Sequence, residues 1–507
     1  MHPVETYLKR LREIRRTGHH TPEVSFYGAL EELLNEAGKK LKPRVIAVMT
    51  LANKGAGLPD GGLFITDQLS DYEAGSTMPP NPARGVIEVK PVEDDAWVTA
   101  SGRQVSRYWG KYRQVLVTNY RDFVLVGQNA EGQPRKLESF RLADSVTEFW
   151  DAATTPRRTD GAQGDRFLEF LRRVLLHAAP IATPQDLAWY LASYAREAAA
   201  RAGDPDFAAL AGIRTALEEG LGVRFEGARG DHFFRSTLVQ TLFYGVFSAW
   251  VLWSKQTPPT ATSRFEWHDA IWYLHVPVIS TLFHQIATPA TLRTSTIEEV
   301  LNWTGDVLNR VDRPSFFERF EEGQAVQYFY EPFLQAFDPE LRKQLGVWYT
   351  PPEVVRYMVA RVDAALRDEL GVADGLADPN VYVLDPCCGT GSYLVEVLNR
   401  VAKTLKAKGG NGLLAYDLKQ AARTRVFGFE ILPAPFVVAH LQLGLLLQNY
   451  GAPLGDDGRE RAAVYLTNAL TGWRPDGTHV QLLLPELGEE RDAANNVKRK
   501  APILVVL

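Results

Sequence analysis

The sequence predicts an α/β fold, and three observations support this prediction. Short runs rich in Val, Ile, Leu and Phe alternate with helical segments over residues 1–150, and the same pattern resumes at about residue 341. A strand-like segment also passes through a glycine-rich turn directly into a helix near residue 390. We therefore predict α/β parts at residues 1–150 and 341–507, with a linker at residues 151–164 and an all-helical part at residues 165–340.

Length and charge limit the possible classes of protein without choosing one. The 507 residues suffice for about two to four domains. The net charge of −5 gives no overall basic signature, so any contact with DNA must come from local groups. Candidates for such a local basic patch are Arg103, Arg107, Lys111 and Arg113.

The cysteine content favours a reducing compartment. Only Cys387 and Cys388 are present; adjacent cysteines rarely form a disulfide, and two are too few for a metal cluster. The N-terminus lacks the apolar run of a signal peptide, and no uncharged apolar run has the length of a membrane span. We expect a cytoplasmic protein without a membrane partner.

The first 150 residues contain one strong helix signal and several strands. Thr21 and Pro22 form a typical helix start, and apolar residues follow at helical spacing to Leu34. A Pro-rich loop is expected at residues 70–83. The β-rich runs predict strands at residues 44–50, 62–66, 85–90, 114–118 and 123–127.

Acidic and basic residues cluster where these strands begin and end. Asp60 precedes one strand, and alternation along another strand places Glu88 and Lys90 on the same face. Asp60, Glu88 and the carbonyl of Val89 offer the oxygen ligands that Mg²⁺ prefers. Lys90 is suited to orient an attacking water or to stabilise charge on a phosphate. Taken alone, such residues at strand ends are more often solvated surface.

These residues, in this order, resemble the PD-(D/E)xK nuclease superfamily. Gln104 and Tyr108 match the Q-x-x-x-Y element of one branch, and their spacing places them on one helix face. The resemblance implies an α/β nuclease domain at residues 1–150 with a Mg²⁺ site at Asp60, Glu88 and Val89. It implies catalytic roles for Asp60, Glu88, Lys90, Gln104 and Tyr108.

The resemblance also implies a metal-binding glutamate on the N-terminal helix. Glu23, Glu31 and Glu32 all remain candidates for this position. In the helical part that follows, tryptophans are frequent, and we interpret them as core packing rather than as base-stacking residues. They are Trp250, Trp253, Trp267 and Trp272.

The second α/β part begins with the sequence Leu-Asp-Pro-Cys-Cys-Gly-Thr-Gly-Ser-Tyr-Leu at residues 384–394. Gly389 and Gly391 lack a Cβ, so the backbone there can approach a ligand closely. The ligand would lie beyond a strand end and at a helix N-terminus. A dinucleotide fingerprint needs three glycines, and this loop has two. A plain strand-to-helix turn is the alternative interpretation.

This loop resembles the S-adenosylmethionine loop of N6-adenine DNA methyltransferases. Upstream, Tyr349, Thr350 and Pro351 resemble the Tyr-Thr-Pro element of that family, with Thr350 as the expected N-cap and Pro351 in the first helical turn. Downstream, a strand over residues 425–430 ends in an acidic residue that would accept hydrogen bonds from the cofactor ribose.

The next strand, over residues 464–470, contains Asn468, which either contacts the cofactor adenine or simply forms a turn. The resemblance implies a Rossmann-like class I methyltransferase at residues 341–507. The cofactor-binding residues that it implies are Tyr349, Thr350, Pro351, Asp385, Pro386, Gly389, Thr390, Gly391, Glu430, Ile431 and Asn468.

The segment at residues 330–346 resembles the junction in single-chain restriction–modification enzymes of the type IIG and type ISP kinds, in which a helical coupler joins nuclease and methyltransferase. No Gly-x-x-x-x-Gly-Lys-Ser/Thr loop is present, which favours the type IIG arrangement. The resemblance implies adenine-N6 methylation of double-stranded DNA, Mg²⁺-dependent cleavage of unmodified DNA, and a role in phage defence.

One family motif is missing from the sequence. The Asn/Asp-Pro-Pro-Tyr/Phe string that holds the target base does not occur, and Ala501 to Leu507 resembles the strand that should precede it. We therefore expect an incomplete methyltransferase, with a missing target-recognition domain or additional subunits. The alternative is a DNA-engaging subunit that binds S-adenosylmethionine and uses the methyltransferase fold as a sensor.

Overall fold

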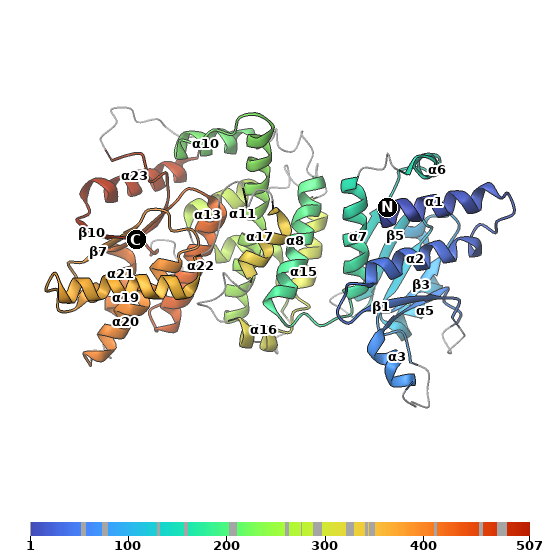
Figure 1. Ribbon diagram of the computed structural model, residues 1–507, viewed down its shortest axis with the longest axis horizontal. Coiled ribbons are helices and arrows are strands. Elements are labelled where there is room, and N and C mark those ends of the chain that lie inside the picture. Colours follow the sequence, from blue (N-terminus) through green and yellow to red (C-terminus); the bar gives the residue numbers. More distant parts are fainter. Residues whose placement is uncertain are drawn as a thin grey trace. The chain divides into compact units, whose positions relative to one another are not determined.

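The computed structural model has a mixed α/β fold with mostly helical content. It describes residues 2–51, 57–73, 80–128, 132–156, 161–201, 210–258, 263–274, 276–286, 297–320, 329–339, 343, 350–409, 413–455, 460–473 and 484–507. The chain divides into two compact units, Met1–Pro180 and Ile181–Leu507 (Figure 1). The α/β class predicted from the sequence is thus confirmed.

The first unit contains a six-stranded sheet in the order β1-β2-β3-β4-β5-β6. Its strands are β1 (Val45–Met49), β2 (Gly61–Ile65), β3 (Val86–Val89), β4 (Val115–Thr118), β5 (Asp122–Gln128) and β6 (Pro134–Arg141). The β3–β4 pair is parallel and the other pairs are antiparallel. A parallel pair needs a crossover, which α4 (Ala96–Ala100) and α5 (Arg103–Tyr112) supply.

Helices cover both faces of this sheet, because its central strands are apolar on both sides. The larger core lies against α1 (Pro3–Arg16), α2 (Tyr27–Gly38), α6 (Val146–Thr154) and α7 (Gly161–Leu176). The smaller core lies against α4 and α5. A short helix, α3 (Thr66–Glu73), follows β2, and the 3₁₀ turn η1 (Val24–Phe26) precedes α2.

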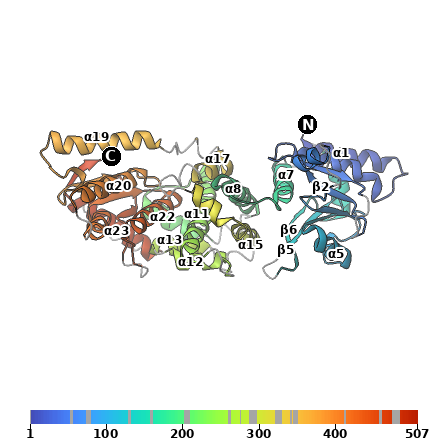
Figure 2. The same ribbon diagram turned by 90° about the horizontal axis from the view of Figure 1, so that it is seen from below.

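Several boundaries differ from the sequence prediction. The unit does not end at residue 150, because α7 packs against α2 and β6 (Figure 2). Phe167 and Phe170 of α7 are buried in the core of this unit. The predicted linker at residues 151–164 therefore holds the end of α6 and the start of α7; residues 157–160 lie outside the described residues. The helix expected from Thr21 begins at Tyr27, after η1. The loop expected at residues 70–83 overlaps the end of α3.

The second unit contains a four-stranded, fully parallel sheet in the order β10-β7-β8-β9. Its strands are β7 (Tyr382–Asp385), β8 (Val426–Glu430), β9 (Val464–Leu466) and β10 (Ile503–Val506). The crossovers are α20 (Ser392–Ala407) with α21 (Leu414–Thr424), α22 (Pro433–Asn449) and α23 (Pro485–Lys500). The helix α19 (Pro352–Asp368) and the turn η6 (Gly375–Ala377) precede β7. The strands predicted at this end of the chain are present, but the one expected over residues 464–470 ends at Leu466.

The remainder of the second unit is helical, as predicted. It consists of α8 (Pro184–Arg201), α10 (Ala211–Leu221), α11 (Gly227–Gln256), η3 (Trp267–Asp269), α12 (Ala270–Tyr273), α13 (Pro277–Ile286), α15 (Ile297–Leu308), α16 (Arg313–Arg319) and α17 (Glu331–Phe337). The helix α11 is buried on all sides and packs against α22 of the α/β part. The helical and α/β parts therefore share one compact unit rather than separating near residue 340.

The tryptophans of the helical part do not all pack in the core. Trp250, Trp253 and Trp267 are buried, as expected, whereas Trp272 of α12 is 75% exposed, so the core interpretation is wrong for that residue. Among the described residues, no helix is both long and apolar enough to cross a membrane.

Candidate functional site

The first candidate site lies where β2 begins and β3 ends. Asp60 directly precedes β2, and its Oδ2 accepts a hydrogen bond from the backbone N–H of Val89 at 2.7 Å. The hydroxyl of Tyr27 donates to Asp60 Oδ1 at 2.6 Å. Glu88 lies in β3 and is 1% exposed. The pairing of β2 with β3 therefore brings two of the predicted metal-binding carboxylates to one place.

Lys90 and Glu88 form a close pair at this site. Lys90 Nζ donates to Glu88 Oε1 at 2.5 Å and to the carbonyl of Val89 at 3.0 Å. Glu88 Oε2 is buried and has no hydrogen-bond partner among the described residues. An unsatisfied buried carboxylate oxygen is costly, so it suits a site that receives a cation.

Burial dominates the electrostatics of this pair. It raises the pKa of Glu88 to about 7; Lys90 opposes this shift and the Asp60 carboxylate adds to it. Burial lowers the pKa of Lys90, but the hydrogen bond to Glu88 and the surrounding carboxylates outweigh it and leave that pKa raised. Lys90 is thus held as a cation beside the acidic residues.

Gln104 and Tyr108 lie on α5, one turn apart as predicted. Gln104 Nε2 donates to the Tyr108 hydroxyl at 3.0 Å. Burial raises the pKa of Tyr108, and the charges of Glu88 and Asp60 contribute to the shift. The structure therefore brings the Q-x-x-x-Y face of α5 next to the acidic residues.

The three candidate glutamates differ in position. Glu23 Oε1 lies 3.3 Å from the Tyr27 hydroxyl, and its charge contributes to the raised pKa of Glu88. Glu32 is exposed and pairs with Arg10 instead. Among the residues that the structure describes, no contact places Glu31 at the site. Within the described parts of the chain, no cluster of three or more His, Cys, Asp or Glu side chains has a metal-binding arrangement.

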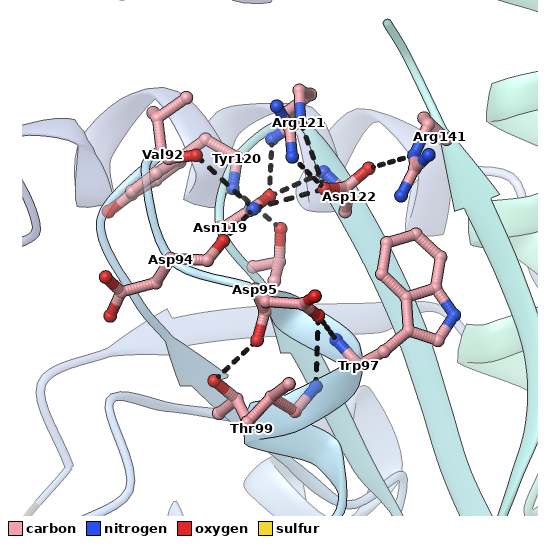
Figure 3. A network of polar contacts seen from close by, with 12 residues as sticks. Val92, Asp94, Asp95, Trp97, Thr99, Asn119, Tyr120, Arg121, Asp122 and Arg141 are labelled. Carbon is pink, nitrogen blue, oxygen red and sulfur yellow. Dashed lines mark hydrogen bonds and ion pairs between the residues drawn. The ribbon is translucent and has the colours of Figure 1, made fainter. Parts of the chain in front are cut away.

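A buried polar network fixes the loop that follows Lys90 (Figure 3). Asn119 Nδ2 donates to the carbonyls of Val92 at 3.4 Å and Asp94 at 2.6 Å, and also to Asp122. Asp122 is fully buried and accepts from Arg121 and Arg141, so its charge is compensated. The turn between β4 and β5 therefore holds the β3–α4 loop in place.

The second candidate site lies at the carboxyl ends of β7 and β8. Asp385 ends β7, is 4% exposed, and accepts a hydrogen bond from the N–H of Cys387 at 3.1 Å. Burial raises the pKa of Asp385 to about 7, and the nearby charge of Glu430 adds to the shift. Neighbouring parallel strands thus bring both predicted acidic residues to one edge of the sheet.

The loop between β7 and α20 has the backbone that its glycines predict. Gly389 has φ +55°, and a Cβ added there would meet no atom within 4 Å. Gly391 has φ +87° and lies at the N-cap of α20, with Ala439 close by. Pro386 and Thr390 lie in the same loop, and the Thr390 carbonyl accepts from Gln442 at 2.6 Å. The space beside Gly389 is available to a ligand.

Glu430 is held by the backbone that follows it. Its Oε1 accepts from the N–H groups of Ile431 at 2.9 Å and Leu432 at 2.8 Å. Burial raises the pKa of Glu430, and these N–H groups and that of Gly389 oppose the shift. Glu430 therefore lies against the glycine loop, and Ile431 holds its carboxylate.

For the remaining predicted cofactor-binding residues, the structure either differs from the prediction or does not describe the residue. Tyr349 lies outside the described residues. Thr350 is not the N-cap of α19, because the helix begins at Pro352 and Pro351 occupies the cap position without a side-chain bond. Asn468 Oδ1 accepts from the N–H of Leu470 at 2.9 Å, so its side chain forms the turn that was the alternative interpretation.

Lys498 of α23, which sequence reasoning missed, organises the loop after β9. Its Nζ donates to Thr467 Oγ1 at 2.9 Å and to the carbonyls of Asn468 at 2.8 Å and Thr471 at 2.9 Å. Burial lowers the pKa of Lys498 to about 8. A lysine near the end of a polar helix gives no sequence signal for such a role.

Residues 322–452 match the N-6 DNA Methylase family model. This part of the chain is thus similar to N-6 DNA methylase domains, and that similarity implies a domain that uses S-adenosylmethionine. The comparison with curated proteins gives no match.

Three solved structures are similar to the chain at low identity. The DrdV–DNA complex has a TM-score of 0.39 and 19% identity, covering 99% of this chain and 43% of that one. The ATP-dependent type ISP restriction–modification enzyme LlaBIII bound to DNA has a TM-score of 0.40 and 16% identity. The match covers 71% of this chain and 21% of that one. The type IIG restriction endonuclease BpuSI has a TM-score of 0.24 and 13% identity. The match covers 86% of this chain and 41% of that one. The chain spans less than half of the length of each.

Proposed function

We propose that the chain is the nuclease, coupler and cofactor-binding part of a restriction–modification enzyme that acts on double-stranded DNA. The observation that carries the proposal is the glycine loop with Asp385 and Glu430 at one sheet edge, within the segment that matches the methylase family. The parallel order β10-β7-β8-β9 supports a Rossmann-like methyltransferase. The nuclease assignment rests on the acidic site of the first unit.

The methylase residues fit S-adenosylmethionine. The bound cofactor supplies a methyl group on a positively charged sulfur. Asp385 and Glu430 offer carboxylates at the ligand-facing edge of the sheet, and Gly389 leaves room for close approach. These residues would hold and orient the cofactor, and correct alignment supplies much of the catalysis in such a transfer. The acceptor adenine would be held by residues beyond this set.

The acidic site of the first unit fits Mg²⁺. Asp60 and Glu88 are oxygen ligands, and the unpartnered Glu88 Oε2 would be satisfied by a cation. A bound Mg²⁺ supplies charge neutralisation and lowers the pKa of a bound water. Lys90 is placed to stabilise charge that develops on a phosphate, and Gln104 with Tyr108 lines the same side. Cleavage of unmodified phage DNA is the proposed outcome.

The second candidate function is that of a DNA-engaging subunit that senses S-adenosylmethionine, for which the glycine loop with Asp385 and Glu430 would serve equally. Incubation with unmethylated DNA and S-adenosylmethionine carrying a labelled methyl group separates the two functions. Label on adenine N6 would favour the enzyme, and cofactor binding without transfer would favour the sensor.

The cofactor assignment is tested by Gly389→Ala. We expect S-adenosylmethionine affinity to fall at least roughly tenfold, because a methyl group would occupy space that the ligand needs. Gly409→Ala is the matched control, since Gly409 also has a positive φ and an open Cβ position but lies at the end of α20. Calorimetric titration measures both. Equal affinity in the two variants would refute the assignment.

Loss of the Lys498 contacts is expected to lower the free energy of unfolding of the second unit by a few kcal/mol. Lys498→Met leaves three acceptors of the loop after β9 without their charged donor, and each such bond contributes about 1.5–3 kcal/mol. Lys500→Met changes an exposed residue of the same helix and should have no effect. Denaturant unfolding of both variants checks this expectation, and an unchanged free energy of unfolding in Lys498→Met would contradict it.

A further inference from the structure

The two oxygens of the Asp60 carboxylate are held from different parts of the chain. Oδ2 accepts from the N–H of Val89 in β3, and Oδ1 accepts from the hydroxyl of Tyr27 in α2. The proposed nuclease mechanism uses Asp60 as a metal ligand but assigns no role to Tyr27. A carboxylate with both oxygens bonded has its plane fixed, so Tyr27 contributes to its orientation.

Tyr27 also lies between two carboxylates. Its hydroxyl is 2.6 Å from Asp60 Oδ1 and 3.3 Å from Glu23 Oε1. A phenol has one proton, so it donates to one of them at a time, and the shorter distance selects Asp60. The charges of Asp60 and Glu23 also raise the pKa of Glu88, so both carboxylates contribute to the electrostatics of the site. A neutral donor between Asp60 and Glu23 reduces the cost of holding these two carboxylates near each other.

The position of Tyr27 is itself rigid. Tyr27 is the first residue of α2, and its side chain is largely buried in the larger core of the first unit. The preceding residue, Phe26, packs edge-on against Tyr120, with the ring centroids 5.3 Å apart. The Tyr120 hydroxyl donates to the carbonyl of Glu23. The segment from Glu23 to Tyr27 is therefore fixed at both ends, and the hydroxyl has little freedom to move.

We propose that Tyr27 is a positioning residue of the nuclease site, whose hydroxyl sets the orientation of Asp60 and its spacing from Glu23 for divalent-cation binding. The inference rests on the proposed nuclease function. It goes beyond the motif residues, because Tyr27 would act through the Asp60 carboxylate and not as a metal ligand itself. Removal of a residue that hydrogen-bonds to a metal ligand typically weakens metal binding by about 10- to 100-fold.

The test is the binding of Mn²⁺ to the full chain, measured by the loss of the free-ion signal in electron paramagnetic resonance. Tyr27→Phe removes one oxygen and keeps the ring that packs in the core. We expect the dissociation constant for Mn²⁺ to rise roughly tenfold. Tyr7→Phe is the matched control, since the Tyr7 hydroxyl is also buried but donates to the backbone carbonyl of Tyr120. It should bind Mn²⁺ as the parent chain does.

Cleavage assays then separate positioning from general damage. In Tyr27→Phe, the Mg²⁺ concentration for half-maximal cleavage should rise roughly tenfold, while the rate at saturating Mg²⁺ approaches that of the parent chain. Structural damage would lower the maximal rate instead. Far-ultraviolet circular dichroism at the assay temperature verifies that the variant is folded.

Glu88→Gln separates failure of this inference from failure of the proposed function. Should Glu88→Gln bind Mn²⁺ as tightly as the parent chain, the nuclease site itself is refuted. Should Glu88→Gln lose binding while Tyr27→Phe keeps the parent affinity, the site stands and the role of Tyr27 is refuted. A tenfold loss in Tyr27→Phe with no change in Tyr7→Phe supports the role.

Discussion

Replacing Glu88 by glutamine is expected to reduce Mg²⁺-dependent cleavage of DNA by roughly 1000-fold. A metal ion supplies several kcal/mol of stabilisation to a transition state, and each 1.36 kcal/mol changes the rate tenfold. Glutamine keeps the shape of Glu88 but removes the charge, and with it both the buried Oε2 ligand and the ion pair with Lys90. The amide also offers a hydrogen-bond donor where a cation should bind.

Conversion of supercoiled plasmid to nicked and linear forms, with and without a chelator, measures this effect. Glu93→Gln is the matched control, because Glu93 is an exposed glutamate three residues beyond Lys90. It should cut like the parent chain. Lys90→Ala is expected to lose activity to a similar extent, since no other cation is seen to contact Glu88 among the described residues. Cutting by Glu88→Gln at the parent rate would exclude the assignment.

S-adenosylmethionine is expected to bind about tenfold more tightly at pH 7.5 than at pH 6. Burial, with the charge of Glu430, raises the pKa of Asp385 to about 7 in the free chain, so this carboxyl is mostly protonated at pH 6. The cofactor is cationic and favours the ionised carboxylate. Binding must therefore expel a proton below pH 7, and each pH unit below the pKa costs up to tenfold in affinity.

The raised pKa of Asp385 also makes the stability of the fold depend on pH. The folded pKa of Asp385 lies above its ordinary value of 3.8, so the unfolded chain releases this proton first as the pH rises. The contribution of Asp385 to stability is therefore greatest below about pH 4 and is lost as the pH rises to about 7. Asp385→Asn cannot titrate, so this contribution should be absent from its stability profile.

Calorimetry at pH 6 and 7.5, in buffers of different ionisation enthalpy, measures both the affinity and the proton released. Asp385→Asn should bind roughly 100-fold more weakly at pH 7.5, because a buried charge-assisted contact of about 3 kcal/mol is lost. Its affinity should also depend less on pH than that of the parent chain. Asp368→Asn changes an exposed carboxylate at the end of α19 and should behave like the parent chain. An unchanged pH profile in Asp385→Asn would contradict the assignment.

Local patterns predicted the framework of both sites. The apolar runs before Asp385 and around Glu88 predict strands, and the structure places both carboxylates at strand ends or edges. The spacing of four between Gln104 and Tyr108 predicts a shared helix face, and their side chains are hydrogen bonded. Such features depend on residues within a few positions of each other, so one sequence suffices to predict them.

Contacts between distant segments could not be predicted in this way. Tyr27 reaches Asp60 across 33 positions, and a tyrosine in an amphipathic helix looks like an ordinary core residue. The strand β6 was missed because one of its buried positions is Glu138, whose charge is balanced by Arg173 of α7. Trp272 is exposed because the four-residue helix α12 buries only Ala270. In each case, contacts with distant parts of the chain decide whether a side chain is buried or exposed, and they override what the neighbouring residues predict.

The burial of α7 in the first unit has a practical consequence for exchanging modules between proteins of this kind. A gene fusion cut after residue 150 would discard Phe167 and Phe170, which complete the core of that unit, and would leave Glu138 without its arginine. A cut after Pro180 keeps both. Chimaeras that carry this unit should therefore be joined between Pro180 and Ile181.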